Sequence, residues 1–189
     1  MAVSDEALMR AVREGDLPRL GILFERYHLI LFNFLSRMTG SRQVAEDLVQ
    51  EVFLRILKYR ATYRDDARFK AWVYGIARNC RVDYFASRQK VVPLSQEALE
   101  SPDPKPAPEA QIEQQRQSAL LRSALMRLSD DDRELIVLAR YGEMKHQDIA
   151  ELLGVNQGTV KVRLHRALKE LRDTFDQRLE RPLCDAKTR

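Results

Sequence analysis

Apolar residues recur every three to four positions along most of the chain, and almost no stretch alternates apolar with polar residues. The first spacing is typical of amphipathic helices and the second, which is nearly absent, of half-buried strands. The pattern therefore predicts an all-α protein with a loop over about 60–68. We expect helices from Ser4 to Gly15, Pro18 to about Gly40, Ser41 to about Lys58, Phe69 to about Gln89, 113–128, 130–141, 147–153 and Gly158 to about Gln177.

A proline-rich segment interrupts this helical pattern. Five of the seven prolines fall within 93–112, and they alternate with other residues from 102 to 108. Proline at this spacing blocks both helices and sheet ladders, which favours a semi-extended tether. The sequence thus predicts two small helical domains joined by a Pro-rich linker. The predicted segments are an N-terminal domain at 1–92, a linker at 93–112, a C-terminal domain at 113–177 and a tail at 178–189.

Composition fits a globular protein: of 189 residues, 44% are hydrophobic and 32% charged. The net charge of +4 divides into +5 for residues 1–92, −3 for 93–112 and +2 for 113–172. Two mildly basic blocks are therefore joined by an acidic one, a balance that alone barely favours nucleic acid as a partner. No apolar run approaches the ~18 residues of a membrane span and no signal peptide is evident, so we expect a cytoplasmic protein without direct membrane insertion.

Chemistry-bearing residues are too scattered for a catalytic or metal site. Cys80 and Cys184 are far apart, and the three histidines have no evident partners. The acidic run 130–132 follows Ser129 at a helix start, where capping and the helix dipole account for it. No nucleophile–base pair or P-loop is present. We therefore expect no enzyme activity, no metal and no cofactor.

Residues 147–172 have the pattern of a helix-turn-helix. A short apolar face precedes Gly154, a turn residue, and the apolar stripe of a second helix begins at Val160. Five basic side chains against one acidic one lie within 157–172, whereas 129–154 holds seven acidic against three basic. A solvated basic helix is the simpler alternative, but the combination favours a helix that reads the major groove of DNA. Its candidate contacts are Thr159, Lys161, Val162, Arg163, His165, Arg166 and Lys169.

Two further surfaces allow two interpretations each. Between Tyr59 and Lys90, eight basic residues are interleaved with seven of the fourteen aromatics. This composition suits single-stranded nucleic acid, but aromatics at helical spacing also form cores. Within 45–57, a stripe of carboxylates surrounds an exposed leucine, which suits either docking on a basic partner or plain solvation.

Three motifs together resemble the extracytoplasmic-function (ECF) sigma factors of bacterial RNA polymerase. They are AEDLVQEVFLRIL, FKAWVYGIARNCRVDYFASR and the final helix-turn-helix with GTVKVRLHRA, and the likeness covers about residues 5–175. The resemblance implies that Asp47, Gln50, Glu51 and Leu54 bind core polymerase. It implies that the second domain reads the minus-35 element through the candidate contacts above. It also implies recognition and melting of the minus-ten element by Tyr63, Arg64, Asp65, Phe69, Trp72, Tyr74 and Asn79.

The same resemblance implies an anti-sigma factor as an inhibitory partner, besides core polymerase and promoter DNA. The main alternative is an autonomous regulator that binds operators as a dimer. Such a regulator needs a self-association helix, and the sequence offers no heptad seam.

Overall fold

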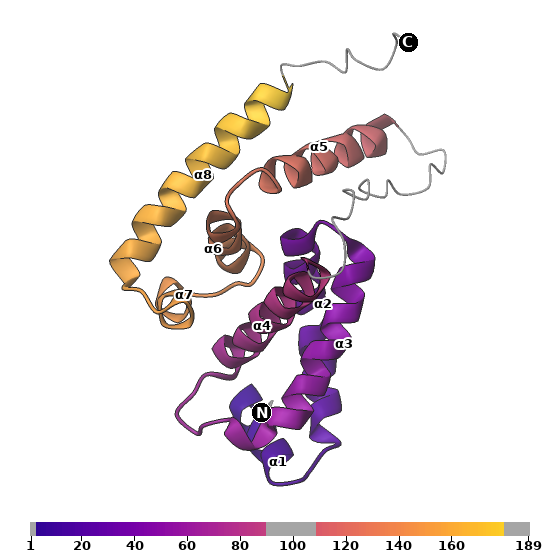
Figure 1. The fold of residues 1–189 in the computed structure, drawn as a ribbon, viewed down its shortest axis with the longest axis vertical. Coiled ribbons are helices and arrows are strands. Elements are labelled where there is room, and N and C mark those ends of the chain that lie inside the picture. Colours follow the sequence, from indigo (N-terminus) through magenta and orange to yellow (C-terminus); the bar gives the residue numbers. More distant parts are fainter. Residues whose placement is uncertain (1–2, 90–108, 180–189) are drawn as a thin grey trace.

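The computed structural model describes residues 3–89 and 109–179, and these ranges contain helices and no strand (Figure 1). The elements are α1 (Asp5–Arg13), α2 (Arg19–Thr39), α3 (Arg42–Tyr59), the 3₁₀ helix η1 (Arg60–Thr62), α4 (Phe69–Gln89), α5 (Glu109–Leu125), α6 (Asp130–Arg140), α7 (His146–Leu153) and α8 (Gln157–Leu179). The all-α prediction is confirmed. We call residues 3–89 the N-terminal unit and 109–179 the C-terminal unit.

Local capping places the helix ends close to where the sequence predicts them. The hydroxyl oxygens of Ser4, Ser41 and Ser129 each accept a hydrogen bond from a backbone N–H in the first turn of the following helix. Gly40 ends α2 in the left-handed conformation, with φ of 76°. These short-range signals need no tertiary contact, which explains why periodicity and capping residues predict them.

The N-terminal unit is built on an α2–α3 pair against which α4 and α1 pack. The apolar stripes of these helices meet in a core that includes Leu23, Leu31, Phe34, Val52 and Val73, all with no exposed surface. Aromatic rings hold the start of α4 in place by edge-to-face contacts, for example between Tyr27 and Phe69, whose ring centres are 5.0 Å apart. The core thus fixes which side of α3 and α4 faces solvent.

In the C-terminal unit, α8 packs on α5, α6 and α7. Figure 1 shows α8 as the long outer helix, with α7 leading into its N-terminal end. α5 begins at Glu109, inside the segment predicted as linker, and ends at Leu125 rather than near 128. Residues 93–108 of the predicted linker, and the tail beyond 179, lie outside the described residues.

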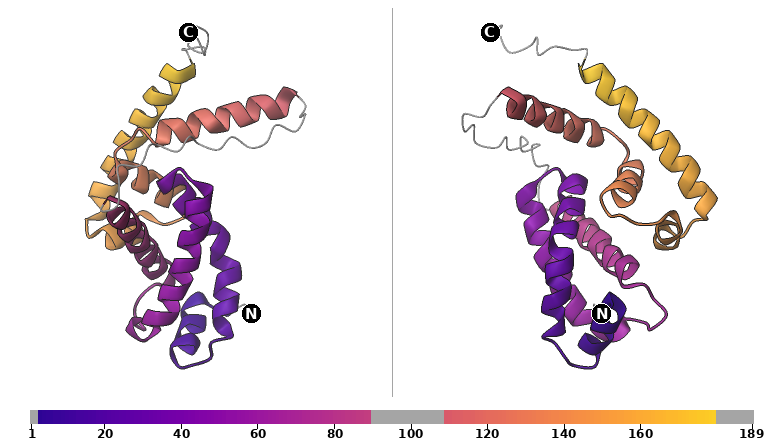
Figure 2. Two further views of the ribbon diagram at one scale, coloured as in Figure 1. Left: turned by 45° about the vertical axis from the view of Figure 1, so that its right-hand side comes forward. Right: turned by 180° about the vertical axis from the view of Figure 1, so that it is seen from behind.

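The two units are in contact with each other. α6 packs on α2, and α7, the first helix of the helix-turn-helix, packs on α4 (Figures 1 and 2). Buried apolar residues form one continuous cluster that includes members from both units. The sequence pattern gave no indication of this docking.

None of the helices within residues 3–89 and 109–179 is long and apolar enough to cross a membrane. Across residues 3–89 and 109–179, no group of three or more His, Cys, Asp or Glu side chains is arranged to hold a metal ion.

Candidate nucleic-acid and partner interfaces

The helix-turn-helix is formed by α7, a tight turn and α8. Gly154 ends α7 with φ of 67°, a backbone conformation that disfavours residues with a Cβ. Asn156 then caps α8, since its side-chain oxygen accepts a hydrogen bond from the Thr159 amide at 2.7 Å. Val155 donates its amide to Ala150 at 2.9 Å, which closes the turn. The turn geometry therefore fixes the direction in which α8 leaves the unit.

The solvent-facing side of α8 carries most of the predicted contacts. Val162 is 62% exposed, although valine gains nothing from facing water. The exposed members around it are Lys161, His165, Arg166 and Lys169. On the opposite side, Val160, Leu164 and Ala167 are buried. The helix thus presents a cationic surface with a methyl-bearing centre, as predicted.

Two of the predicted contacts on α8 are already engaged within the protein. The Thr159 hydroxyl donates to the side-chain oxygen of Asn156 at 3.0 Å, so it belongs to the helix cap. Arg163 lies 3.5 Å from the carboxylates of both Asp131 and Asp132, in the first turn of α6. In this conformation Arg163 joins α8 to α6 rather than reaching outward.

The predicted minus-ten residues separate into exposed and buried groups. Arg64, Asp65 and Asn79 are exposed, and Trp72 is half-buried with its ring 5.1 Å from that of Tyr63. Trp72 and Asn79 are seven positions apart on α4 and so share one side of the helix. Trp72 and Asn79 are therefore available to contact a ligand, whereas Arg64 and Asp65 are exposed but paired with neighbouring side chains.

The other three are core residues, which corrects their predicted role as direct contacts. Tyr63, Phe69 and Tyr74 are at most 1% exposed. Tyr63 donates its hydroxyl to the carbonyl of Ala67 at 2.7 Å, and burial is the main cause that raises its pKa to about 12. Burial likewise raises the pKa of Tyr74, with a smaller contribution from the charge of Glu143. The alternative interpretation of these aromatics, as helix packing, is the one the geometry supports.

The loop before α4 is held by ion pairs. Arg13 of α1 donates to the Tyr63 carbonyl at 2.9 Å and lies 2.9 Å from the Asp65 carboxylate. Arg64 pairs with Asp66 at 3.0 Å, and this arginine lowers the pKa of the Asp66 carboxyl. Both Arg64 and Asp66 remain well exposed. The loop therefore presents charged side chains to solvent, while its bonds to Arg13 of α1 hold it in place.

The acidic stripe of α3 faces solvent as predicted. Asp47 and Gln50 are exposed, and Leu54 is 63% exposed. Glu51 differs, because Arg55 donates to it at 2.7 Å and also to Asp83 of α4 at 2.6 Å. These two carboxylates raise the pKa of Arg55. Glu51 thus takes part in tying α3 to α4, while the other three are free to bind a partner.

One aromatic beside the acidic stripe was not predicted. Phe24 of α2 is 39% exposed, stacks on His28 at 4.9 Å and contacts Phe53 of α3 edge-on at 4.9 Å. A phenylalanine within an apolar helix is normally a core residue, so periodicity alone could not single it out. It places an aromatic side chain beside α3, in contact with that helix.

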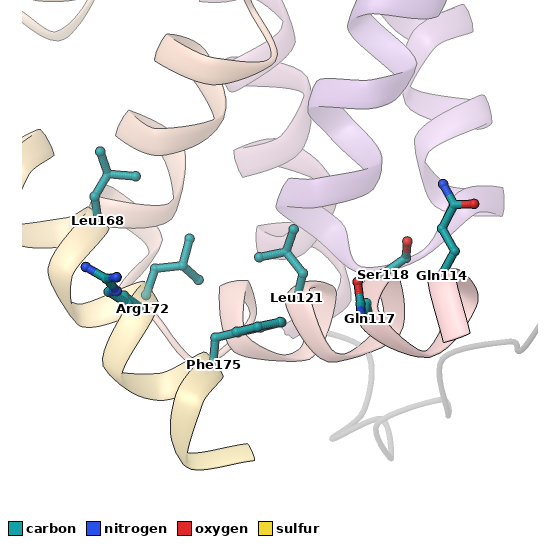
Figure 3. Close-up of a pocket in the computed structure, with 8 residues that line it drawn as sticks. Gln114, Gln117, Ser118, Leu121, Leu168, Arg172 and Phe175 are labelled. Atoms are coloured by element: carbon teal, nitrogen blue, oxygen red, sulfur yellow. The ribbon is translucent and has the colours of Figure 1, made fainter. Parts of the chain in front are cut away.

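A groove between α5 and α8 was also not predicted. It has a volume of about 410 Å³, and Figure 3 shows Phe175 extending from α8 toward α5. Its lining residues are Gln114, Gln117, Ser118, Leu121, Leu168, Leu171, Arg172 and Phe175. The groove exists because α5 and α8 diverge, which depends on how the two helices cross and not on either sequence alone.

Comparison with known protein families finds two matches, one in each unit. Residues 23–91 match the family described as Sigma-70 region 2, and residues 118–171 match Sigma-70, region 4. The first range contains α3, the loop and α4, and the second contains the helix-turn-helix.

Similar proteins cover nearly the whole chain. The ECF RNA polymerase sigma factor SigL of Mycobacterium tuberculosis is 32% identical over 181 residues, which is 93% of each chain. The ECF RNA polymerase sigma factor RpoE of Cereibacter sphaeroides is 31% identical over 169 residues, covering 88% of this chain and 92% of the other.

Two solved structures share the fold. CnrH, in complex with the cytosolic domain of CnrY, superposes with a TM-score of 0.70 at 22% identity, over 92% of this chain and 97% of the other. The sigma factor RpoE of Bartonella quintana, in complex with the anti-sigma factor NepR, has a TM-score of 0.65 at 24% identity, over 82% of this chain and 96% of the other.

Proposed function

The chain belongs to the extracytoplasmic-function sigma factors of bacterial RNA polymerase, and we propose how its surfaces divide the work of promoter recognition. Proteins of this family are transcription initiation factors that direct the polymerase to promoters, and they are not enzymes. The remaining question is which residues of this chain make each contact.

The minus-35 element is read by the exposed side of α8. The observation that carries this assignment is Val162, 62% exposed at the centre of a cationic helix face. In the major groove, a valine fits against a thymine methyl group, while Lys161 and Arg166 can reach base edges or phosphates. His165 and Lys169 extend the same face. Arg163 can join them only by leaving its ion pairs with α6.

The minus-ten element is bound by the side of α4 that carries Trp72 and Asn79, together with Arg64 and Asp65 of the loop. A half-buried indole can stack on an unpaired base without losing its own support, because Tyr63 holds it from behind. Tyr63 and Phe69 act as that support and do not touch DNA. Tyr74 packs against the C-terminal unit, where a Cβ on Gly142 would lie 2.9 Å from its hydroxyl.

Core polymerase is bound by α3 through Asp47, Gln50 and Leu54. Glu51 adds its negative charge to this surface while it remains bonded to Arg55. A leucine bordered by acidic and amide groups suits a helical partner with basic residues around an apolar centre. Phe24 on the neighbouring helix adds an aromatic group beside this surface.

We also propose an anti-sigma factor as an inhibitory partner. RpoE of Bartonella quintana was solved in complex with an anti-sigma factor, and its fold matches this chain over most of its length. Since the proposed partners are polymerase and promoter DNA, we place the protein in the cytoplasm.

Co-elution with bacterial core RNA polymerase on size exclusion, at moderate salt, tests the docking surface. The wild-type chain should form a stoichiometric complex, and Asp47→Lys should abolish it because the reversed charge repels a basic partner. Glu14→Lys is the matched control: it makes the same charge change at an exposed position after α1 and should leave the complex intact.

Circular dichroism of both variants should match the wild type. Unchanged polymerase affinity for Asp47→Lys would remove the docking assignment. Tight binding of the free chain to duplex DNA, without any polymerase complex, would instead favour the operator-binding regulator.

A further inference from the structure

The loop between η1 and α4, residues 63–68, is held at both ends by α1. At its start, the Arg13 guanidinium donates to the Tyr63 carbonyl at 2.9 Å. At its end, a Glu6 carboxylate oxygen accepts the backbone N–H of Phe69, the first residue of α4, at 3.3 Å. Two side chains of one short helix therefore hold positions that lie 50 and 63 residues further along the chain.

The bond from Glu6 supplies a helix cap that the loop itself lacks. Arg68 occupies the N-cap position of α4, since its carbonyl accepts the Trp72 N–H at 3.1 Å. The amides of the first helical turn have no partner within the helix, and an arginine side chain has no acceptor to offer them. Glu6 satisfies one of these amides and places a negative charge at the positive end of the helix dipole. The start of α4, which carries Trp72, therefore depends on α1.

Arg13 holds the exposed part of the loop as well as its start. Nη1 of Arg13 makes the bond to Tyr63, while Nη2 lies 2.9 Å from Oδ1 of Asp65. The Asp65 side chain is 61% exposed, but that of Arg13 is only 24% exposed. Because a partly buried pair is screened less than an exposed one, salt weakens this anchor little. Asp65 keeps further lone pairs, with which it can accept from the exocyclic amine of an unpaired base.

The spacing of the two anchors on α1 sets the shape of the loop. Glu6 and Arg13 are seven positions apart, so they share one side of the helix and lie about 10 Å apart along its axis. The chain between the two residues that they hold could extend to about 20 Å. It must therefore bow outward, and it does so in a turn closed by the Ala67 N–H, which donates to the Arg64 carbonyl at 3.1 Å. Residues 64–66 of this turn are exposed.

α1 is itself fixed on the N-terminal unit. The Asp5 carboxylate accepts from the Tyr27 hydroxyl at 2.6 Å and from Arg26 at 2.5 Å, both on α2. The apolar side of α1 is fully buried through Leu8, Met9 and Val12. The helix cannot shift without losing these contacts, so its anchors are rigid. Since the match to Sigma-70 region 2 covers residues 23–91, α1 lies outside it.

We propose that Glu6 and Arg13 are positioning residues, which hold the loop and the start of α4 in the geometry that discriminates the bases of the minus-ten element. The inference rests on the proposed function and deepens it: Arg64, Asp65 and Trp72 contact the DNA, and α1 fixes where they lie. A loop that is held before binding loses little conformational freedom when it binds. It therefore selects among bases more sharply than a loop that the DNA must first order.

Selection of promoter sequences by the reconstituted holoenzyme tests this role. The DNA pool keeps one minus-35 sequence selected by the wild type and carries a randomised minus-ten region. Arg13→Gln should bind core polymerase and keep its minus-35 preference, but its base preference should weaken about tenfold at one or more minus-ten positions. Arg10→Gln is the matched control, because it removes the same charge from an exposed position of the same helix, and it should select the wild-type sequences.

Base preference separates positioning from mere stability. A variant that only unfolds more easily has a smaller active fraction, which lowers its binding equally for every sequence and leaves the preference unchanged. Each α1 variant that folds and keeps the wild-type minus-ten preference removes its anchor from the proposal, and wild-type preference in the variants of both anchors would overturn it.

Two substitutions of Glu6 provide a test that does not depend on the folding of Arg13→Gln. Glu6→Gln should keep the minus-ten preference, because its amide oxygen can still accept the Phe69 N–H. Glu6→Ala removes the acceptor and should weaken the preference about tenfold, as Arg13→Gln does. Equal selection by the two Glu6 variants would refute the capping role.

Trp72→Ala is the reference for the proposed function. If it too retains every minus-ten preference of the wild type, the assignment of α4 and the loop to the minus-ten element fails. If Trp72→Ala loses preference while the α1 variants keep it, only the positioning role fails, so the two failures are distinguishable.

Discussion

Replacing Arg133 with lysine tests how much one buried guanidinium contributes to stability. Arg133 lies among the ends of two helices, and burial lowers the pKa of its guanidinium while Asp130 opposes that change. Its N–H groups donate to four backbone carbonyls at 3.0–3.2 Å, those of Leu125, Met126, Leu128 and Met38. Arg133→Lys retains the charge but presents one nitrogen in place of three.

The expected loss follows from the number of bonds. A lysine ammonium at this position can keep about two of the four contacts, since its donors diverge from a single atom. Each lost bond from a charged donor to a buried carbonyl costs about 1.5 kcal/mol. The free energy of unfolding should therefore fall by about 3 kcal/mol.

Urea unfolding followed by far-ultraviolet circular dichroism measures this loss. With an m-value of about 2 kcal/mol per molar urea, the midpoint should fall by about 1.5 M. Arg127→Lys is the matched control, because Arg127 is an exposed arginine in the connection before α6 and should change stability by less than about 0.5 kcal/mol. A midpoint for Arg133→Lys equal to that of the control would refute the capping argument.

Three further predictions concern single positions. Tyr74→Phe should raise the free energy of unfolding by about 1 kcal/mol in thermal melts, because the buried Tyr74 hydroxyl has no hydrogen-bond partner among the described residues. A lower stability of the variant would show that the hydroxyl is bonded. Gly154→Ala should lower the free energy of unfolding by about 1 kcal/mol, because the φ of 67° at this position disfavours a residue with a Cβ. Gly21→Ala, within α2 and with no atom near the added Cβ, should be neutral or stabilising, and equal effects of the two substitutions would contradict the turn argument. Arg166→Ala should weaken holoenzyme binding to a selected minus-35 duplex by about 1–3 kcal/mol, while Arg122→Ala on α5 should not, as measured by fluorescence anisotropy; no loss at low salt would remove Arg166 from the interface.

Fold class and helix positions were predictable from the sequence because their causes are local. Apolar spacing places the buried stripes, and Ser4, Ser41 and Ser129 lie where first-turn amides need acceptors. The exposed face of α8 was predictable for the same reason, since a helix with one apolar stripe can only turn its other side, including Val162, to solvent.

The aromatic segment shows where local information ends. Tyr63, Phe69, Trp72 and Tyr74 are all compatible with either stacking on bases or packing in a core, because both need a planar apolar ring. The choice depends on what lies opposite each ring. Phe69 is buried where its ring meets that of Tyr27 on α2. Tyr74 packs edge-on against Phe34 of α2, while its hydroxyl lies beside Gly142 of the C-terminal unit.

The sequence by itself thus determined the helices, their solvent-facing chemistry and, through its motifs, the family. The tertiary structure decided which of those groups are free. Arg163, Glu51 and Thr159 all lie on the predicted faces, yet each is engaged by a neighbour. The ion pair between Arg78 and Glu134 joins residues 56 positions apart on different helices. Periodicity carries no information on such a pairing, because it reports the environment of one helix and not the identity of its neighbour.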